Sequence, residues 1–223
     1  MKKYEITNET ICVGGKTLYR IKSLIDFSNV TQGTLGGFIE KETNLSHDNN
    51  AWVYGNAKVY DNACVYGNAM VRDNAKVCGD ARVYDNAKVC GDAMVHGNAE
   101  VYDNAWVYGN AKVYDNAMVR DNASVGGDAE VYGSTMVYGN VWLGDDAMIR
   151  DDADYLHFMG LGSCNRNTTF FKCHDGHIHV FCGCFHGNLA EFENQVRETH
   201  GDTKYAKEYL ACVTTVKIHF GIE

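Results

Sequence analysis

Apolar positions recur with a period of six along the centre of this chain. From Ala51 to Ala153 a small position opens each of 18 hexads, and it is alanine in all but two. A larger apolar residue, usually valine, follows two positions later, and nearly every hexad ends in Gly or Asp followed by Asn or Asp. Alternation places both apolar positions on one face of a short strand, and Gly, Asp and Asn tolerate the backbone of a corner. The pattern therefore predicts one strand and one corner in each hexad.

Three such strands close a triangular coil, so the repeat predicts about six stacked coils, roughly 29 Å tall at a strand spacing of about 4.8 Å. At this point the chain resembles the left-handed hexapeptide β-helix proteins, in which a small residue follows an aliphatic residue by four positions. Val53 with Ala57 and Val59 with Ala63 fit that motif. The left-handed sense is what the resemblance implies, since parallel crossovers are otherwise right-handed. The expected fold class is mainly β, a left-handed parallel β-helix of about six triangular coils with a small C-terminal α+β module.

The chain divides into three parts by pattern, with expected boundaries at residues 1–50, 51–156 and 157–223. In the first part, Gly14 and Gly15 predict the two-residue turn of a hairpin, and a degenerate lead-in coil follows it. We interpret this part as a cap, because the first coil of a β-helix exposes unpaired backbone groups.

The last part has the pattern of a small β-β-α-α module. Residues 168–173 and 177–182 predict a hairpin, and Asn188 and Asp202 are the expected N-caps of two helices. A module of this size is expected to pack on the last coil or on a neighbouring subunit.

Composition narrows the expected partners. The chain has 223 residues, nine cysteines and a net charge of −9. Residues 51–156 hold 16 acidic against 8 basic residues, which argues against binding to a nucleic-acid backbone. No apolar stretch approaches a membrane span and no export signal is visible, so we expect a cytoplasmic protein with reduced cysteines and no membrane partner.

Aromatic residues gather on two sides of the expected prism, because residues 18 apart lie above one another. One side carries Trp52, Trp106 and Trp142, and another carries Tyr66, Tyr84, Tyr102 and Tyr138. Aromatic columns on a β-surface can serve cross-strand packing alone. We favour burial between subunits, since long aromatic faces are rarely left exposed, and a homotrimer is what the resemblance implies.

The two ends of the chain carry a narrower resemblance. NRNTTFFK, GCFHGNLAEFENQV, ETHGDTKYAKEYL and VKIHF resemble the C-terminal module of hexapeptide-repeat proteins from bacteriophages and prophages, and LGGFIEKETNLS resembles their N-terminal cap. Together with the repeat, the resemblance covers nearly the whole chain. The resemblance implies a viral origin and a place in the host bacterial cytoplasm. It implies no particular activity, because that family has none that is settled. Action on host defence, by binding a host protein or sequestering a nucleotide signal, is the function that this context suggests.

Candidate binding residues lie in the C-terminal part. Arg166, Thr168 and Thr169 are donors suited to an anion, and His200, Tyr205 and Tyr209 could stack on a base or form hydrogen bonds with it. The alternative is that the threonines are ordinary strand residues and the tyrosines belong to a core. We expect a non-enzymatic protein that binds a partner or a small anionic or nucleotide ligand, with no cofactor.

The sequence also bears on two other kinds of site, an acyltransferase active site and a structural zinc site. A CoA-dependent acyltransferase, the alternative function, needs a general base, and His96 is the only histidine in the regular hexads, which also lack an inserted catalytic loop. The tail is rich in Cys and His, but its spacing lacks the two pairs typical of a structural zinc site. We therefore expect no metal, with the cysteines as core residues and the histidines solvated.

Overall fold

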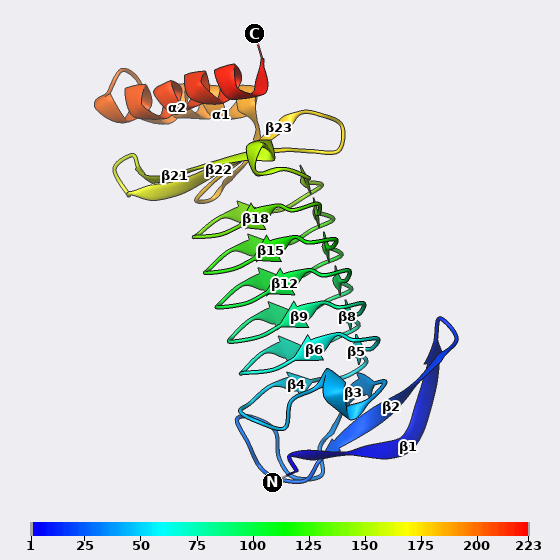
Figure 1. Cartoon of the computed structure of the whole chain (residues 1–223). Helices are drawn as coiled ribbons and strands as arrows, with labels where there is room; N and C mark the ends of the chain where they lie inside the picture. The colour runs from blue at the N-terminus through cyan, green and yellow to red at the C-terminus, as the bar shows by residue number, and fades with distance from the viewer. Residues whose placement is uncertain (1, 223) are drawn as a thin grey trace.

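The computed structural model describes residues 2–222 as a cap, a solenoid of stacked coils and a C-terminal module, arranged in that order (Figure 1). Short parallel strands build the solenoid, and they form three sheets along its sides. The strands are β4 (Trp52–Val53), β5 (Lys58–Val59), β6 (Cys64–Val65), β7 (Met70–Val71), β8 (Lys76–Val77), β9 (Arg82–Val83), β10 (Lys88–Val89), β11 (Met94–Val95), β12 (Glu100–Val101), β13 (Trp106–Val107), β14 (Lys112–Val113), β15 (Met118–Val119), β16 (Ser124–Val125), β17 (Glu130–Val131), β18 (Met136–Val137), β19 (Trp142–Leu143) and β20 (Met148–Ile149).

Each strand pairs in parallel with the strands 18 residues before and after it. Lys88 in β10, for example, lies between Met70 in β7 and Trp106 in β13. One sheet consists of the six strands from β4 to β19, which corresponds to about six turns. The predicted fold class of stacked parallel coils with a small C-terminal α+β module is confirmed, and the left-handed sense stays a prediction.

The solenoid core contains the two apolar positions of each hexad. Val101 lies between Val83 and Val119 of the neighbouring coils, and all three side chains have no exposed surface. The first residue of every corner from Gly55 to Asp145 has a positive φ, as at Asp121 (60°) and Gly139 (76°). The Asp121 carboxylate accepts a hydrogen bond from the Gly139 amide at 2.9 Å, so aspartate at a corner also joins successive coils.

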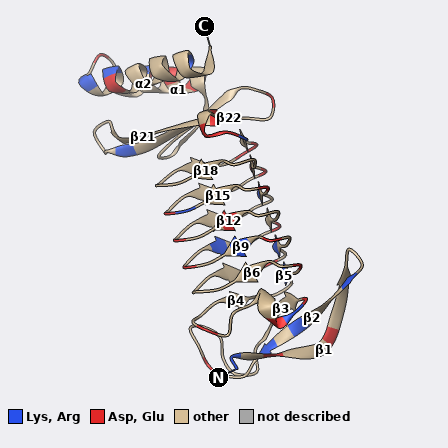
Figure 2. Cartoon of the chain, viewed as in Figure 1, with Lys and Arg blue, Asp and Glu red and all other residues tan. Residues whose placement is uncertain are grey.

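One corner carries an uninterrupted ladder of asparagines. Asn86 donates its side-chain amide to Asn104 at 3.3 Å and accepts a hydrogen bond from Asn68 at 3.1 Å. The ladder runs from Asn50 to Asn140 with one hydrogen bond between successive coils. Acidic residues lie at many of the corners (Figure 2).

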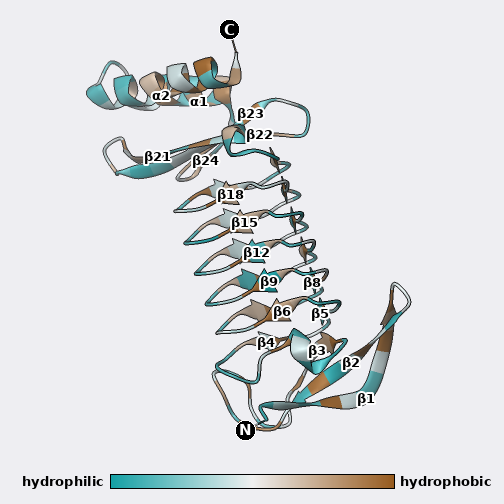
Figure 3. Ribbon diagram, viewed as in Figure 1, coloured by the Kyte–Doolittle hydropathy of each residue, from teal (hydrophilic) through white to brown (hydrophobic). Residues whose placement is uncertain are grey.

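The cap continues one of the solenoid sheets. Its elements are β1 (Tyr4–Val13), β2 (Lys16–Ser23), β3 (Leu35–Ile39) and the short helix η1 (Glu42–Asn44). The predicted hairpin at Gly14 and Gly15 joins β1 to β2, along which hydrophobic and hydrophilic segments alternate (Figure 3). β3 then pairs with β2 on one side and with β5 on the other, which extends the sheet into the first coil.

The C-terminal module is a four-stranded antiparallel sheet covered by two helices. After the turn η2 (Asp152–Asp154), its elements are β21 (Tyr155–Leu161), β22 (Arg166–Lys172), β23 (Ile178–Cys182), β24 (Phe185–Asn188), α1 (Leu189–His200) and α2 (Lys204–Phe220). The central hairpin of β22 and β23 is as predicted. The predicted order of two strands and two helices was wrong, because the module has four strands before its two helices. β21 continues from the last coil and β24 is short, so neither strand carries a strong pattern of its own.

Both helices begin at side-chain caps. Asn188 is the N-cap of α1 as expected and forms a capping box with Glu191, and Gly201 is the C-cap of this helix. The N-cap of α2 is Thr203, whose hydroxyl accepts from the Ala206 amide, and not Asp202. Among residues 2–222, neither helix is long and apolar enough to cross a membrane.

Candidate ligand cavity in the C-terminal module

A cavity of about 480 Å³ opens between α1 and the helix-facing side of the module sheet. This volume is in the range of small-molecule sites, which usually combine apolar walls with a few converging polar groups. The lining residues come from the β21–β22 turn, the start of β22, the β23–β24 hairpin and both helices: Ser163, Cys164, Arg166, Cys182, Cys184, Phe185, Phe192, Gln195, Val196, Thr199, His200 and Tyr209.

Arg166 brings a positive charge to this cavity. Among residues 2–222 no carboxylate lies within ion-pair distance of its guanidinium, which contacts the Cys184 sulfur weakly at 3.8 Å and also the Cys164 thiol. That contact lowers the pKa of the Cys184 thiol, because the cation favours the thiolate. The arginine is therefore available to an anion from solution.

Glycine at position 183 makes room for this arginine. Gly183 has a φ of +64°, and a Cβ built on it would overlap the Arg166 guanidinium. A side chain at this position would be strained in its backbone and would displace the arginine. The β23–β24 turn thus leaves space for the guanidinium beside the cavity.

Aromatic rings form the apolar walls. Phe185 and Phe192 lie with ring centroids 5.2 Å apart, and Tyr209 packs edge-on against Phe192 at 5.8 Å. His200 stacks on Tyr209 at 5.7 Å with 23° between the planes. Tyr209 donates its hydroxyl to the Leu161 carbonyl at 3.3 Å, and burial raises the pKa of this phenol, so it stays neutral.

The two threonines predicted as anion donors do not line the cavity. Neighbouring residues of a strand point to opposite faces, and both side chains are buried. Thr168 donates to the Cys182 sulfur at 3.1 Å, whereas Thr169 pairs with His157 at 3.0 Å. Of the alternatives, the ordinary strand role describes these two residues.

Tyr205 lies in a neighbouring hollow. It lines a second cavity of about 430 Å³ together with Lys204 and Glu208, and its ring centroid is 6.2 Å from that of His200. The structure therefore brings together Arg166, His200 and Tyr209 from the predicted set.

Sequence reasoning missed Phe185 and Phe192 as cavity walls. Phe192 lies in α1 and is buried in the core of the module. Phe185 lies in the short strand β24. Only the packing of α1 over that strand shows that both rings face one cavity.

Other parts of the same chain cover two of the three tryptophans in this column. Trp52 has no exposed surface, because the cap covers it with Tyr4 and Phe27. Trp142 packs on Phe181 of the module with ring centroids 3.4 Å apart, and only Trp106 is exposed, at 39%. The expectation that Trp52 lies between subunits is therefore wrong, since its own chain already buries it.

The tyrosine column stays on the surface as a stack. Tyr66, Tyr84 and Tyr102 are parallel at centroid distances of 4.8 and 4.9 Å, and Arg120 lies over the Tyr138 ring at 5.3 Å. Tyr66 and Tyr138 remain 37% and 50% exposed. The residues predicted for an interface are thus accessible on this face.

His96 belongs to another stack. Its ring is parallel to that of Tyr114 at 5.0 Å, and Tyr114 stacks in turn on Tyr132. Partial burial lowers the pKa of His96, which favours the neutral imidazole. It lines neither of the two cavities described above.

Comparisons with known proteins assign no family to this chain. It matches no protein-family model and no curated protein. Function must therefore be argued from the described residues themselves.

Proposed function

We propose that the C-terminal module binds a small ligand that carries both an anionic group and a flat ring, and a nucleotide fits both features. The observation that carries this proposal is the guanidinium of Arg166, which has no carboxylate partner among residues 2–222 and lies beside an aromatic cavity. The protein has a net charge of −9, so a local cation is needed to attract an anion.

The two halves of the site would act on different parts of such a ligand. Arginine can donate two parallel hydrogen bonds to a phosphate, and a charged hydrogen bond contributes about 1.5 to 3 kcal/mol. Phe185 and His200 offer ring faces and edges for stacking, and Gln195 and Thr199 on α1 supply further hydrogen-bonding groups. Recognition by shape and charge needs no catalytic group.

The proposed biological role is sequestration. A protein that holds a nucleotide signal without converting it would counter a host defence in the bacterial cytoplasm, which is the setting implied by the resemblance to phage proteins. An acyltransferase remains the alternative, but His96 lies in an aromatic stack and lines neither cavity.

The test is calorimetric titration of the purified chain with a panel of linear and cyclic nucleotides. Arg166→Ala should weaken binding of the best nucleotide at least tenfold, because one lost charged hydrogen bond costs about 1.5 to 3 kcal/mol. Lys204→Ala is the matched control, since Lys204 is a cation of the neighbouring cavity. Undiminished binding by Arg166→Ala, or unfolding of that variant, would give Arg166 a structural role instead.

We also propose that the chain forms a homotrimer through the face that carries Tyr66 and Tyr138. Aromatic residues are enriched at interfaces, and these two rings are the most exposed members of their column. The stack of Tyr66, Tyr84 and Tyr102 gives a partner subunit a repeating aromatic surface to pack against.

A further inference from the structure

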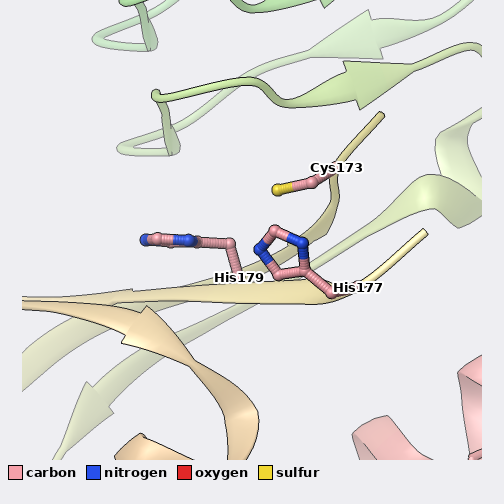
Figure 4. A group of neighbouring side chains, drawn as sticks. All are labelled: Cys173, His177 and His179. Atoms are coloured by element: carbon pink, nitrogen blue, oxygen red, sulfur yellow. The ribbon is translucent and has the colours of Figure 1, made fainter. Parts of the chain in front are cut away.

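Two histidines and a cysteine gather where the module meets the last coil of the solenoid (Figure 4). Cys173 and His177 belong to the β22–β23 turn, and His179 lies in β23. Their ligand atoms, one sulfur and two ring nitrogens, all lie within 4.8 Å of one another. The cluster is separate from the ligand cavity, because His179 is on the solenoid-facing side of the sheet and its neighbours Ile178 and Val180 pack on the helix side.

The fold brings these residues together for a local reason. The Cys173 amide donates to the His177 carbonyl at 3.0 Å, which closes the turn. Cys173 also forms a bridge with Ala147, and the His174 amide donates to the Asp146 carbonyl, so the turn is fixed on the last corner of the solenoid. Strand alternation then places His179 on the same face as His177.

A carboxylate from the solenoid lies beside this cluster, in contact with His179. Asp145 lies in that corner, and its Oδ2 atom is 3.0 Å from Nε2 of His179. This nitrogen is buried and makes no hydrogen bond among the described residues, because the contact lacks hydrogen-bond geometry. Two ligands of one tetrahedral zinc ion are separated by roughly 3.4 Å, close to the observed spacing.

We propose that Cys173, His177 and His179, with Asp145 as the fourth ligand, bind a divalent transition-metal ion of the Zn²⁺ type. Thiolate and imidazole are the ligands that Zn²⁺ prefers, and a carboxylate is a common addition. The His177 ring contacts the Asp175 carboxylate through Nδ1, which leaves Nε2 for the metal. A carboxylate behind a ligating histidine is the usual outer-shell support of zinc sites.

The charge around the cluster favours a cation. Asp145, Asp146 and Asp175 surround Cys173, and the metal would offset this negative potential. Asp145 and the His177 side chain are 48% and 38% exposed, so an ion can enter from solvent. Because Asp145 comes from the solenoid and the other ligands come from the module, the ion would fasten the module to the last coil.

The test uses untagged full-length protein that has been freed of metal with a chelator and then given equimolar zinc sulfate. We expect one zinc ion retained per chain after desalting, and a higher melting temperature than that of the metal-free protein. With cobalt(II) in place of zinc, a thiolate-to-metal absorption band should appear in the wild type and be absent in Cys173→Ser.

Variants separate this site from general surface binding. His177→Ala, at a half-exposed position, should lose zinc while keeping the fold, and Asp175→Asn should weaken affinity by roughly 10- to 100-fold as an outer-shell change. His174→Ala is the matched control, because His174 is an exposed histidine of the same turn. Zinc retention by His177→Ala, absence of the cobalt band in the wild type, or equal loss in His174→Ala would overturn the proposal.

His186 provides a second check. It forms an alternative group with Asp145 and His179, in which no thiol takes part. The proposal expects His186→Ala to retain zinc. Loss of zinc in that variant, with full retention in Cys173→Ser, would also overturn the proposed ligand set.

Discussion

Single residues in this protein are constrained by the coils above and below them. A valine such as Val101 contacts its equivalents in two neighbouring coils and is completely buried. The neighbours of Val101 in that column, Val83 and Val119, are apolar and cannot solvate a charge. Substitutions at inward positions should therefore have effects far beyond those at outward positions.

Val101→Asp should lower the free energy of unfolding by more than about 4 kcal/mol, because it buries an unpaired charge in an apolar column. Chemical denaturation monitored by circular dichroism measures the change. Val101→Ala is the control for lost volume and should cost less, since it adds no charge. A small effect of aspartate would mean that the column is accessible to water.

Buried histidines should make stability depend on pH. Burial lowers the pKa of His157 below its usual value of 6.5, and its Nδ1 atom pairs with the Thr169 hydroxyl. As pH falls below about 6.5, the unfolded chain takes up this proton before the folded chain does. The folded state is therefore fully favoured above that pH and loses stability below it.

His157→Gln should accordingly reduce the loss of stability between neutral and mildly acidic pH. The measurement is the free energy of unfolding across that range, compared with the wild type. His174→Gln, at an exposed position of the same module, is the control for the histidine-to-glutamine change itself. Equal slopes in the wild type and His157→Gln would contradict the assignment.

At the scale of elements, the stacked coils could be predicted from the sequence because each hexad specifies both a strand and a corner. Ala57 and Val59 are inward by alternation alone, and the hairpin at Gly14 follows from turn chemistry. β21 was missed because pairing with β22 defines it and its own sequence does not. A local sequence pattern cannot predict contacts between residues that are far apart in the sequence, such as the packing of the cap over Trp52.

Less of the candidate sites than of the fold could be predicted from the sequence. Arg166 was singled out for its charge, and the structure places it at a cavity. Thr168 and Thr169 failed as a pair because adjacent strand residues face opposite ways. The grouping of Cys173, His177 and His179 could not be predicted, because their spacing matches no standard zinc pattern and the proposed fourth ligand, Asp145, comes from a different part of the chain.

The asparagine ladder offers a test at the same scale. Asn86→Ala removes two inter-coil hydrogen bonds and should cost about 1 kcal/mol, since the bonds are solvent-exposed. Asn50→Ala removes the single bond of a terminal rung and should cost about half as much. Equal losses, measured by denaturant unfolding, would show that the ladder does not act through its hydrogen bonds.

At the scale of the whole molecule, the proposed homotrimer can be tested with interface variants. We expect a sedimentation mass three times the 24.8 kDa of one chain. Replacing Tyr66 and Tyr138 together by Glu should yield monomers, because charge on an apolar interface is costly to bury. The matched control is Tyr132→Glu, which lies on a different side of the solenoid and should remain trimeric. A monomeric wild type would remove the proposal.

The 18-residue period has a consequence for how the gene can change. A repeated amino-acid phrase favours repeated DNA, so we expect recombination between copies to add or delete whole hexads. Loss of three hexads removes one coil and keeps every column on its side, since the paired strands are 18 residues apart. Loss of a single hexad moves every later residue to the next side and turns the module by a third of a turn relative to the cap. Inherited length variants should therefore differ by entire coils, which would alter the separation of the two ends and preserve their relative orientation.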